Sequence, residues 1–109
     1  MNTDICARGF ALTDSLRVAV EREAEEFQRQ LPRGNGPISV RLFDTNGSAR
    51  GGADKVCLVH ARVTGQRASL VATAIDSDLY RAIVSAFAKL SRSARTAAHR
   101  TRSLRRKSS

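Results

Sequence analysis

Apolar residues recur at helical spacing in two stretches of the chain. The first stripe consists of Leu16, Ala19, Val20, Ala24, Phe27 and Leu31. The second consists of Leu79, Ile83, Ala86, Leu90, Ala94 and Ala97. Residues at this spacing share one side of a helix, so each stretch predicts a helix with one buried face. Side-chain oxygens precede both stripes, at Thr13–Asp14 and at 76–78, where they can accept the free amides of a helix start.

Apolar and polar residues alternate in three further stretches, 38–42, 55–63 and 67–75, and this period of two predicts strands. The side chains expected to face the helices are Ile38, Val40, Leu42, Cys57, Val59, Ala61, Val63, Leu70, Ala72 and Ala74. A short apolar stretch from Ile5, broken by Gly9, is typical of an edge strand and its exit. Turn-forming residues indicate loops at 32–37, at 46–54 and at Thr64–Gly65.

The resulting order is β-α-β-β-β-α, which favours an α+β fold. Short turns between successive strands indicate an antiparallel sheet, mixed at one edge. Two helices with one apolar stripe each must both bury that stripe, and one sheet face can cover both. We therefore expect a domain over residues 1–100, similar in layout to double-stranded-RNA-binding domains, with a basic flexible tail at 101–109.

Charge is distributed unevenly along this chain. Residues 1–80 hold ten basic and ten acidic residues, which cancel. The net charge of +9 therefore belongs to residues 81–109, which contain nine Lys or Arg and no Asp or Glu. Exposed helix faces that are merely solvated usually mix both signs, so this segment predicts contact with a polyanion.

The basic residues of the second predicted helix lie mainly opposite its apolar stripe. Those expected to bind RNA are Arg81, Lys89, Arg92, Arg95, His99, Arg100 and Arg102. Beyond Leu90 only alanines continue the apolar stripe, so the helix is expected to pack through its first turns and then to project. Aromatic residues occur only near its start, at Tyr80 and Phe87, which favours contacts to phosphates and duplex shape over base stacking.

Two stretches resemble a known family. Residues 11–20 read Ala-Leu-Thr-Asp-Ser-Leu-Arg-Val-Ala-Val, which is similar to the first helix of the ribosome hibernation-promoting factor and ribosome-associated inhibitor family. Residues 72–83 read Ala-Thr-Ala-Ile-Asp-Ser-Asp-Leu-Tyr-Arg-Ala-Ile, and Lys-Leu-Ser-Arg follows at 89–92. These resemble the last strand and second helix of the same family, also described as sigma-54 modulation proteins.

The resemblance implies a short form of this family, a bacterial protein of stress and stationary phase. Such proteins bind the small (30S) ribosomal subunit and its 16S rRNA in the channel for mRNA and tRNA, and they block translation by occlusion. By position, Lys89 and Arg92 match the family's basic element, and Arg100 lies in its basic continuation. Thr96, Ala97 and Ala98 depart from the further Lys and His residues found there in many members, and Arg95, His99 and Arg102 can supply that charge.

Other functions find less support in the residues. A general double-stranded-RNA-binding module or RNA chaperone would share the basic helix, and membrane-surface binding would need a free apolar face that the sheet already occupies. Cys6, Cys57, His60 and His99 have no metal-ligand spacing, and the odd spacing of Cys57 and His60 places them on opposite strand faces. We expect no enzymatic activity, no cofactor and no small-molecule substrate, and a cytoplasmic protein that is monomeric away from the ribosome.

Overall fold

The computed structural model describes residues 3–30, 36–44, 54–62 and 69–107, with the backbone alone for 97–107. Its elements are β1 (Thr3–Arg8), α1 (Asp14–Arg29), β2 (Ile38–Asp44), β3 (Lys55–Ala61), β4 (Leu70–Asp76) and α2 (Leu79–Lys107). This order confirms the predicted β-α-β-β-β-α arrangement. Residues 32–35 of the predicted loop at 32–37, residues 46–53 of the predicted loop at 46–54, and Thr64–Gly65 lie outside the described residues.

The four strands form one mixed sheet in the order β1-β2-β3-β4. β1 pairs with β2 in parallel, and the other two pairings are antiparallel. Parallel neighbours need a crossover connection, which α1 provides, whereas turns can join antiparallel neighbours. The sheet is thus antiparallel except at the β1 edge, as the sequence predicts.

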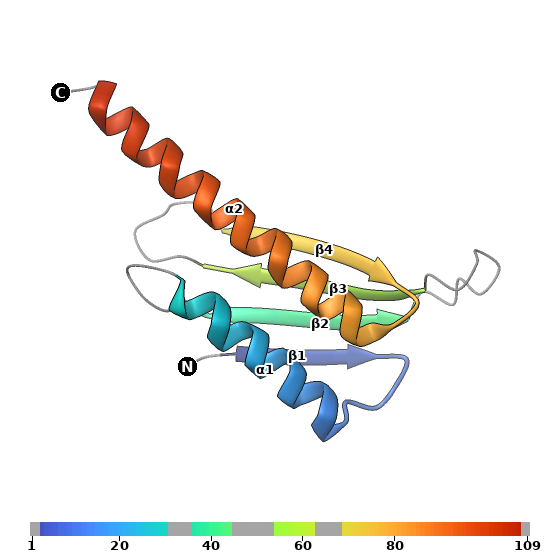
Figure 1. The fold of residues 1–109 in the computed structure, drawn as a ribbon. Coiled ribbons are helices and arrows are strands. Elements are labelled where there is room, and N and C mark those ends of the chain that lie inside the picture. Colours follow the sequence, from blue (N-terminus) through green and yellow to red (C-terminus); the bar gives the residue numbers. More distant parts are fainter. Residues whose placement is uncertain (1–2, 31–35, 45–53, 63–68, 108–109) are drawn as a thin grey trace.

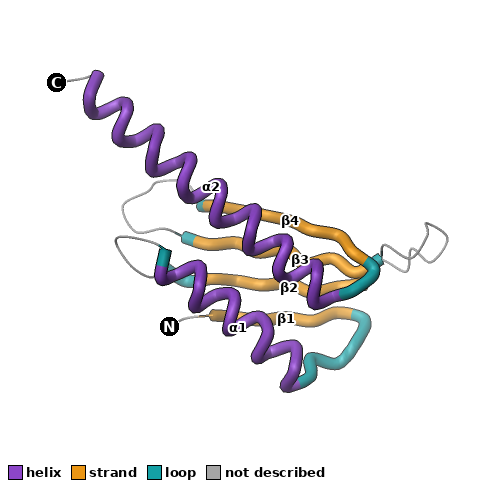
Figure 2. Tube along the Cα trace, viewed as in Figure 1, coloured by secondary structure: helices purple, strands orange, loops and turns teal. Residues whose placement is uncertain are grey.

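Both helices cover the same face of the sheet, and the opposite face carries no helix among the described residues (Figures 1 and 2). The register sets Ile5, Val40, Val59 and Ala72 side by side across the strands on the covered face. The last three of these residues are buried, and Ile5 packs against the core. Small side chains at Ala72 and Ala74 allow α2 to approach β4 closely.

The core joins the apolar stripes of both helices to this face. The fully or nearly buried helix residues are Leu16, Val20, Ala24, Phe27, Ala82, Ile83, Ala86, Phe87, Leu90 and Ala94. The rings of Phe27 and Phe87 meet between the helices with centroids 6.4 Å apart. The predicted inward positions Cys57, Val59 and Ala61 are also buried, while Leu70 is half-buried. Leu31, Val63 and the side chain of Ala97 lie outside the described part of the chain.

Side chains cap both helices where the sequence predicts it. The Thr13 hydroxyl accepts a hydrogen bond from the Leu16 amide at 3.2 Å. At the start of α2, the Asp78 carboxylate accepts one from the Tyr80 amide at 2.9 Å. Each cap satisfies an amide that has no partner inside the helix. Asp14 in the first turn of α1 and Asp78 at the start of α2 also place negative charge near the positive end of each helix dipole.

α2 is longer than the sheet and extends past it (Figure 1). Its packed part reaches Ala94, which is 8% exposed. Ala94 lies one turn beyond Leu90, the last large side chain of the apolar stripe, after which the helix was expected to project. The packed part is longer than expected because a small alanine side chain can still lie against the body. The helix then continues to Lys107 without a break. The division into a domain at 1–100 and a flexible tail at 101–109 stays a prediction.

Candidate nucleic-acid interface

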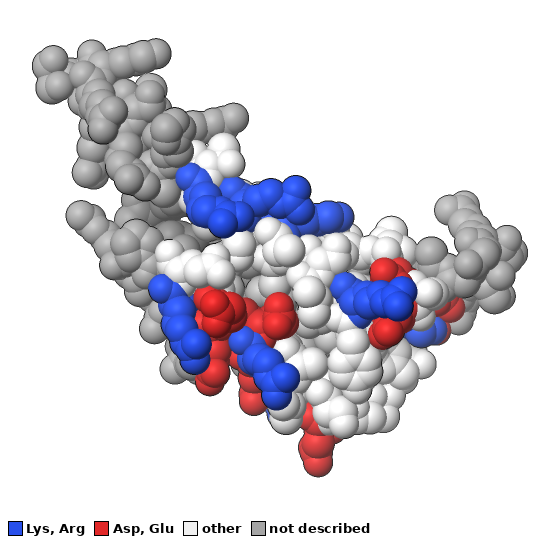
Figure 3. Space-filling view, in the orientation of Figure 1, with Lys and Arg blue, Asp and Glu red and all other residues white. Residues whose placement is uncertain are grey.

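Three arginines lie exposed on the side of α2 that faces away from the sheet. They are Arg81, Arg92 and Arg95. The opposite side of the helix is held by Ile83, Ala86 and Leu90, none of which is exposed to solvent. Because these buried residues fix the rotation of α2, the three arginines are kept on the side of the helix away from the sheet. In Figure 3 blue Lys and Arg atoms gather toward the C-terminal end of the described part of α2, and white surface separates them from a second blue patch that is bordered by red.

Lys89 lies to one side of this row and contacts the sheet. Its ammonium group donates a hydrogen bond to the carbonyl oxygen of Thr73 at 2.9 Å. Thr73 belongs to β4, which is an edge strand. An edge strand presents backbone groups without a neighbouring strand, and a lysine is a common means of covering them. Lys89 therefore ties α2 to the sheet edge, although its side chain is still exposed.

Arg81 is weakly engaged at the start of the helix. Its Nε lies 4.0 Å from Asp78 Oδ2, and the two side chains are 75% and 48% exposed. An ion pair in such exposed positions contributes at most about 1 kcal/mol. Arg81 therefore remains available to a stronger anionic ligand.

Of the seven residues predicted to bind RNA, the structure places Arg81, Arg92 and Arg95 together on the outward side of α2. Lys89 flanks them on the β4 side. The remaining three, His99, Arg100 and Arg102, lie in the helical continuation beyond Ala94, and their side chains are outside the described part. Among the described side chains, Arg92 and Arg95 are thus neighbours on this side of α2, whereas Arg81 lies near the start of the helix.

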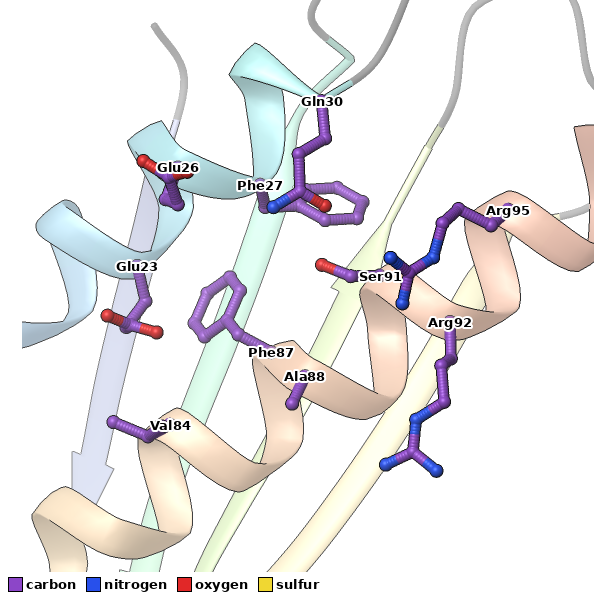
Figure 4. A pocket seen from close by; sticks show the side chains of 10 residues that line it. All are labelled: Glu23, Glu26, Phe27, Gln30, Val84, Phe87, Ala88, Ser91, Arg92 and Arg95. Atoms are coloured by element: carbon purple, nitrogen blue, oxygen red, sulfur yellow. The ribbon is translucent and has the colours of Figure 1, made fainter.

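A groove separates α1 from α2 beside the arginine row. Its volume is about 290 Å³, and its lining consists of Glu23, Glu26, Phe27, Gln30, Val84, Phe87, Ala88, Ser91, Arg92 and Arg95. Figure 4 shows Glu23 and Glu26 on the α1 wall, the two arginines on the α2 wall, and the phenylalanine rings between the helices. Sequence reasoning missed this groove, because it depends on how two distant helices face each other.

The outer surface of α1 has a different electrostatic character from α2. Charges of both signs alternate there, including Glu21, Arg22, Glu25 and Arg29, all of them exposed. Arg29 Nη1 lies 3.3 Å from Glu26 Oε2. In Figure 3 red and blue atoms are interspersed over this region. The sequence of α2 contains Lys and Arg but no Asp or Glu, whereas α1 carries both signs, so a polyanion would be attracted to α2 more than to α1.

Cys57 and His60, two of the residues considered for catalysis or metal binding, lie in different surroundings. Cys57 is fully buried, and the loss of water around its thiol raises the pKa to about 12. His60 is exposed on the opposite sheet face, as the odd spacing predicted. Within the described residues no three His, Cys, Asp or Glu side chains gather as metal ligands. None of the described helices has the length and apolarity needed to cross a membrane.

One lysine is held in a structural ion-pair cluster at the end of the sheet. Lys55 Nζ donates to Asp44 Oδ2 at 2.7 Å and to Asp54 Oδ2 at 3.2 Å. The hydrogen bond to Asp44, followed by that to Asp54, raises the pKa of Lys55 against the opposing effect of desolvation. The ammonium therefore stays charged and ties β2 to β3, rather than serving as a base or nucleophile.

Comparison with known proteins identifies similarities over nearly the whole chain. The family model described as sigma 54 modulation protein / S30EA ribosomal protein matches residues 3–102. A solved ribosomal subunit interface protein from Coxiella burnetii superposes with a TM-score of 0.73 at 15% identity, covering 91% of this chain and 99% of that one. The N-terminal domain of Protein Y from Thermus thermophilus gives a TM-score of 0.65 at 21% identity, covering 86% and 96%. No curated protein sequence matches significantly.

Proposed function

The chain belongs to the sigma 54 modulation protein / S30EA ribosomal protein family, and we propose that it binds the small ribosomal subunit and inhibits translation there. The observation that carries this proposal is the arginine row on α2. These arginines lie on the exposed side of a helix whose opposite side packs against the sheet. The whole net charge of +9 comes from the segment that contains this row.

The row is suited to the phosphate backbone of RNA. Arginine presents several donors in a planar fork that can hold two phosphate oxygens at once. Successive outward positions on a helix follow a line, and α2 extends this line beyond the body (Figure 1). Such contacts fix position on a duplex without reading its sequence directly. Arg81, Arg92 and Arg95 would make them, with His99, Arg100 and Arg102 continuing the line.

Inhibition would follow from occupancy alone. A basic helix along 16S rRNA in the channel for mRNA and tRNA would exclude both ligands, and no bond needs to be made or broken. The acidic and basic mixture on α1 would turn that side away from phosphates. The protein would thereby hold small subunits inactive in the cytoplasm during stress or stationary phase.

Sedimentation with purified small subunits tests the proposal. We expect binding at low salt and release as salt rises, because each phosphate contact releases condensed counterions. If all six Lys and Arg residues of the predicted set meet a phosphate, the logarithm of the association constant should fall against that of the salt concentration with a slope of about −5. A protein that stays at the top of the gradient at low salt would contradict the proposal.

A general double-stranded-RNA-binding module is the second candidate, favoured by the same charge pattern. Naked duplex RNA serves as the competitor in the same gradient. Ribosome-directed binding requires that an excess of duplex RNA displaces little protein from the subunits. Complete displacement of the protein by the same excess of duplex RNA would favour the general module instead.

A further inference from the structure

The groove between α1 and α2 has walls of opposite charge that do not pair with each other. Among the described residues, no ion pair within 4.0 Å joins Glu23 or Glu26 on α1 to Arg92 or Arg95 on α2. Glu26 instead pairs with Arg29 on its own helix. An open volume of about 290 Å³ lies between the two walls. A ligand that donates hydrogen bonds to the carboxylates on α1 and accepts them from the arginines on α2 would satisfy both walls of the groove.

Glu23 is the carboxylate best placed for such an occupant. It is half-buried, and Figure 4 shows it on the α1 side of the groove, beside the Phe87 ring. Arg95, Ser91 and Gln30 stand at the other end of the groove in the same view. One end therefore offers an acceptor with two oxygens, and the other end offers mainly donors.

Apolar side chains form the surface between these two ends. Phe27 and Phe87 lie at its base and are each 2% exposed, whereas Val84 is 53% exposed and Ala88 is also open to solvent. The accessible apolar surface is therefore that of Val84 and Ala88, against which one face of a flat ring could rest. The groove volume of about 290 Å³ falls just below the range for small-molecule pockets, roughly 300 to 1,000 Å³, so the groove would accommodate a single base better than a large ligand.

Guanine has the matching pattern of hydrogen-bonding groups. Its N1 and N2 atoms are neighbouring donors that fit the two oxygens of a carboxylate. Its O6 and N7 atoms are neighbouring acceptors that fit an arginine fork. Adenine carries only its N6 amino group as a base-edge donor, and a phosphate would be repelled by Glu23. The sugar-phosphate backbone would then stay outside the groove, on the neighbouring arginine row.

We propose that the groove between α1 and α2 binds one unpaired guanine of the RNA that α2 holds. This inference rests on the proposed function, since it takes small-subunit rRNA as the source of the base. It adds a base-specific contact to a surface that otherwise recognises phosphates and shape. Glu23 would be the residue that determines specificity. Arg95, whose guanidinium has five N–H donors, would contact both the base edge across the groove and the neighbouring phosphate.

Kethoxal probing of small subunits tests this contact, because the reagent reacts with N1 and N2 of unpaired guanines. In the wild-type complex we expect protection of a guanine in 16S rRNA. In the Glu23→Gln complex, at matched occupancy in the gradient, its reactivity should recover by at least about fivefold, since a bidentate base contact is worth about 1–3 kcal/mol. Glu25→Gln makes the same charge change on the exposed surface of α1 and should retain the protection.

Identical kethoxal patterns for wild type and Glu23→Gln at equal occupancy would overturn the guanine site while leaving subunit binding intact. Failure of the wild type to sediment with subunits would overturn the proposed function as well. Photocross-linking from Ala88→p-benzoylphenylalanine, which places the reactive group inside the groove in the position of the base, should reach rRNA beside the groove. Cross-linking to a ribosomal protein instead would show that the groove holds a protein segment.

Discussion

Replacing Arg81, Arg92 and Arg95 together by glutamate will abolish sedimentation of the protein with small subunits at physiological salt. Each reversal removes one cation from the proposed phosphate path and adds repulsion. We expect at least a 100-fold loss of affinity, on the order of 1 kcal/mol per position, and a salt slope that is shallower by about 3. All three side chains are exposed, so the unfolding free energy should change by no more than about 0.5 kcal/mol per position. Gradients at several salt concentrations measure both effects.

Arg17, Arg22 and Arg29 provide the matched control, because they are exposed on α1 rather than α2. Reversing these three charges changes the net charge by the same amount. Affinity should then fall far less, through long-range electrostatics that salt screens. Equal losses for the two triple variants would mean that net charge matters and the arginine row does not.

Leu90→Ala will destabilise the protein more than any other truncation on α2 beyond Phe87. Leu90 is fully buried where the helix packs on the sheet, and only Ala94 is known to be buried after it. Truncating a buried leucine to alanine costs about 2–5 kcal/mol through lost transfer energy and a residual cavity. This is a large share of the roughly 5–15 kcal/mol that stabilises a typical domain. Urea unfolding followed by circular dichroism measures it.

Val84→Ala on the same helix serves as the comparison, because Val84 is 53% exposed. Its cost should stay below about 1 kcal/mol, since an exposed truncation leaves no cavity. A similar cost for both variants would contradict the view that the packed part of α2 extends through Leu90.

Local chemistry explains why most of the fold could be predicted from the sequence. The helical stripe from Leu16 to Phe27 and the alternation around Val40 and Val59 each depend on one periodicity. The Thr13 cap depends on a hydroxyl that lies a few residues before a free amide. Such patterns lie within one helix or strand, so they can be recognised in the sequence without knowing the tertiary contacts.

Features that depend on how the elements meet were not predictable in this way. Lys89 was grouped with the basic surface of α2, but its ammonium contacts the Thr73 carbonyl on β4. Gln28 is buried, with 7% exposure, although its polar side chain is not part of the apolar stripe from which burial was predicted. Likewise Glu23 and Arg95 belong to helices far apart in the chain, and only the packing of α1 on α2 brings them to one groove.

Competition with mRNA and tRNA tests the central claim most directly. Small subunits are loaded with a short mRNA and a P-site tRNA, and the protein is added before sedimentation at low salt. Occlusion of the channel predicts that loaded subunits bind little protein, and that excess protein in turn reduces tRNA binding to empty subunits. Simultaneous sedimentation of protein, mRNA and tRNA on the same subunits would contradict the account.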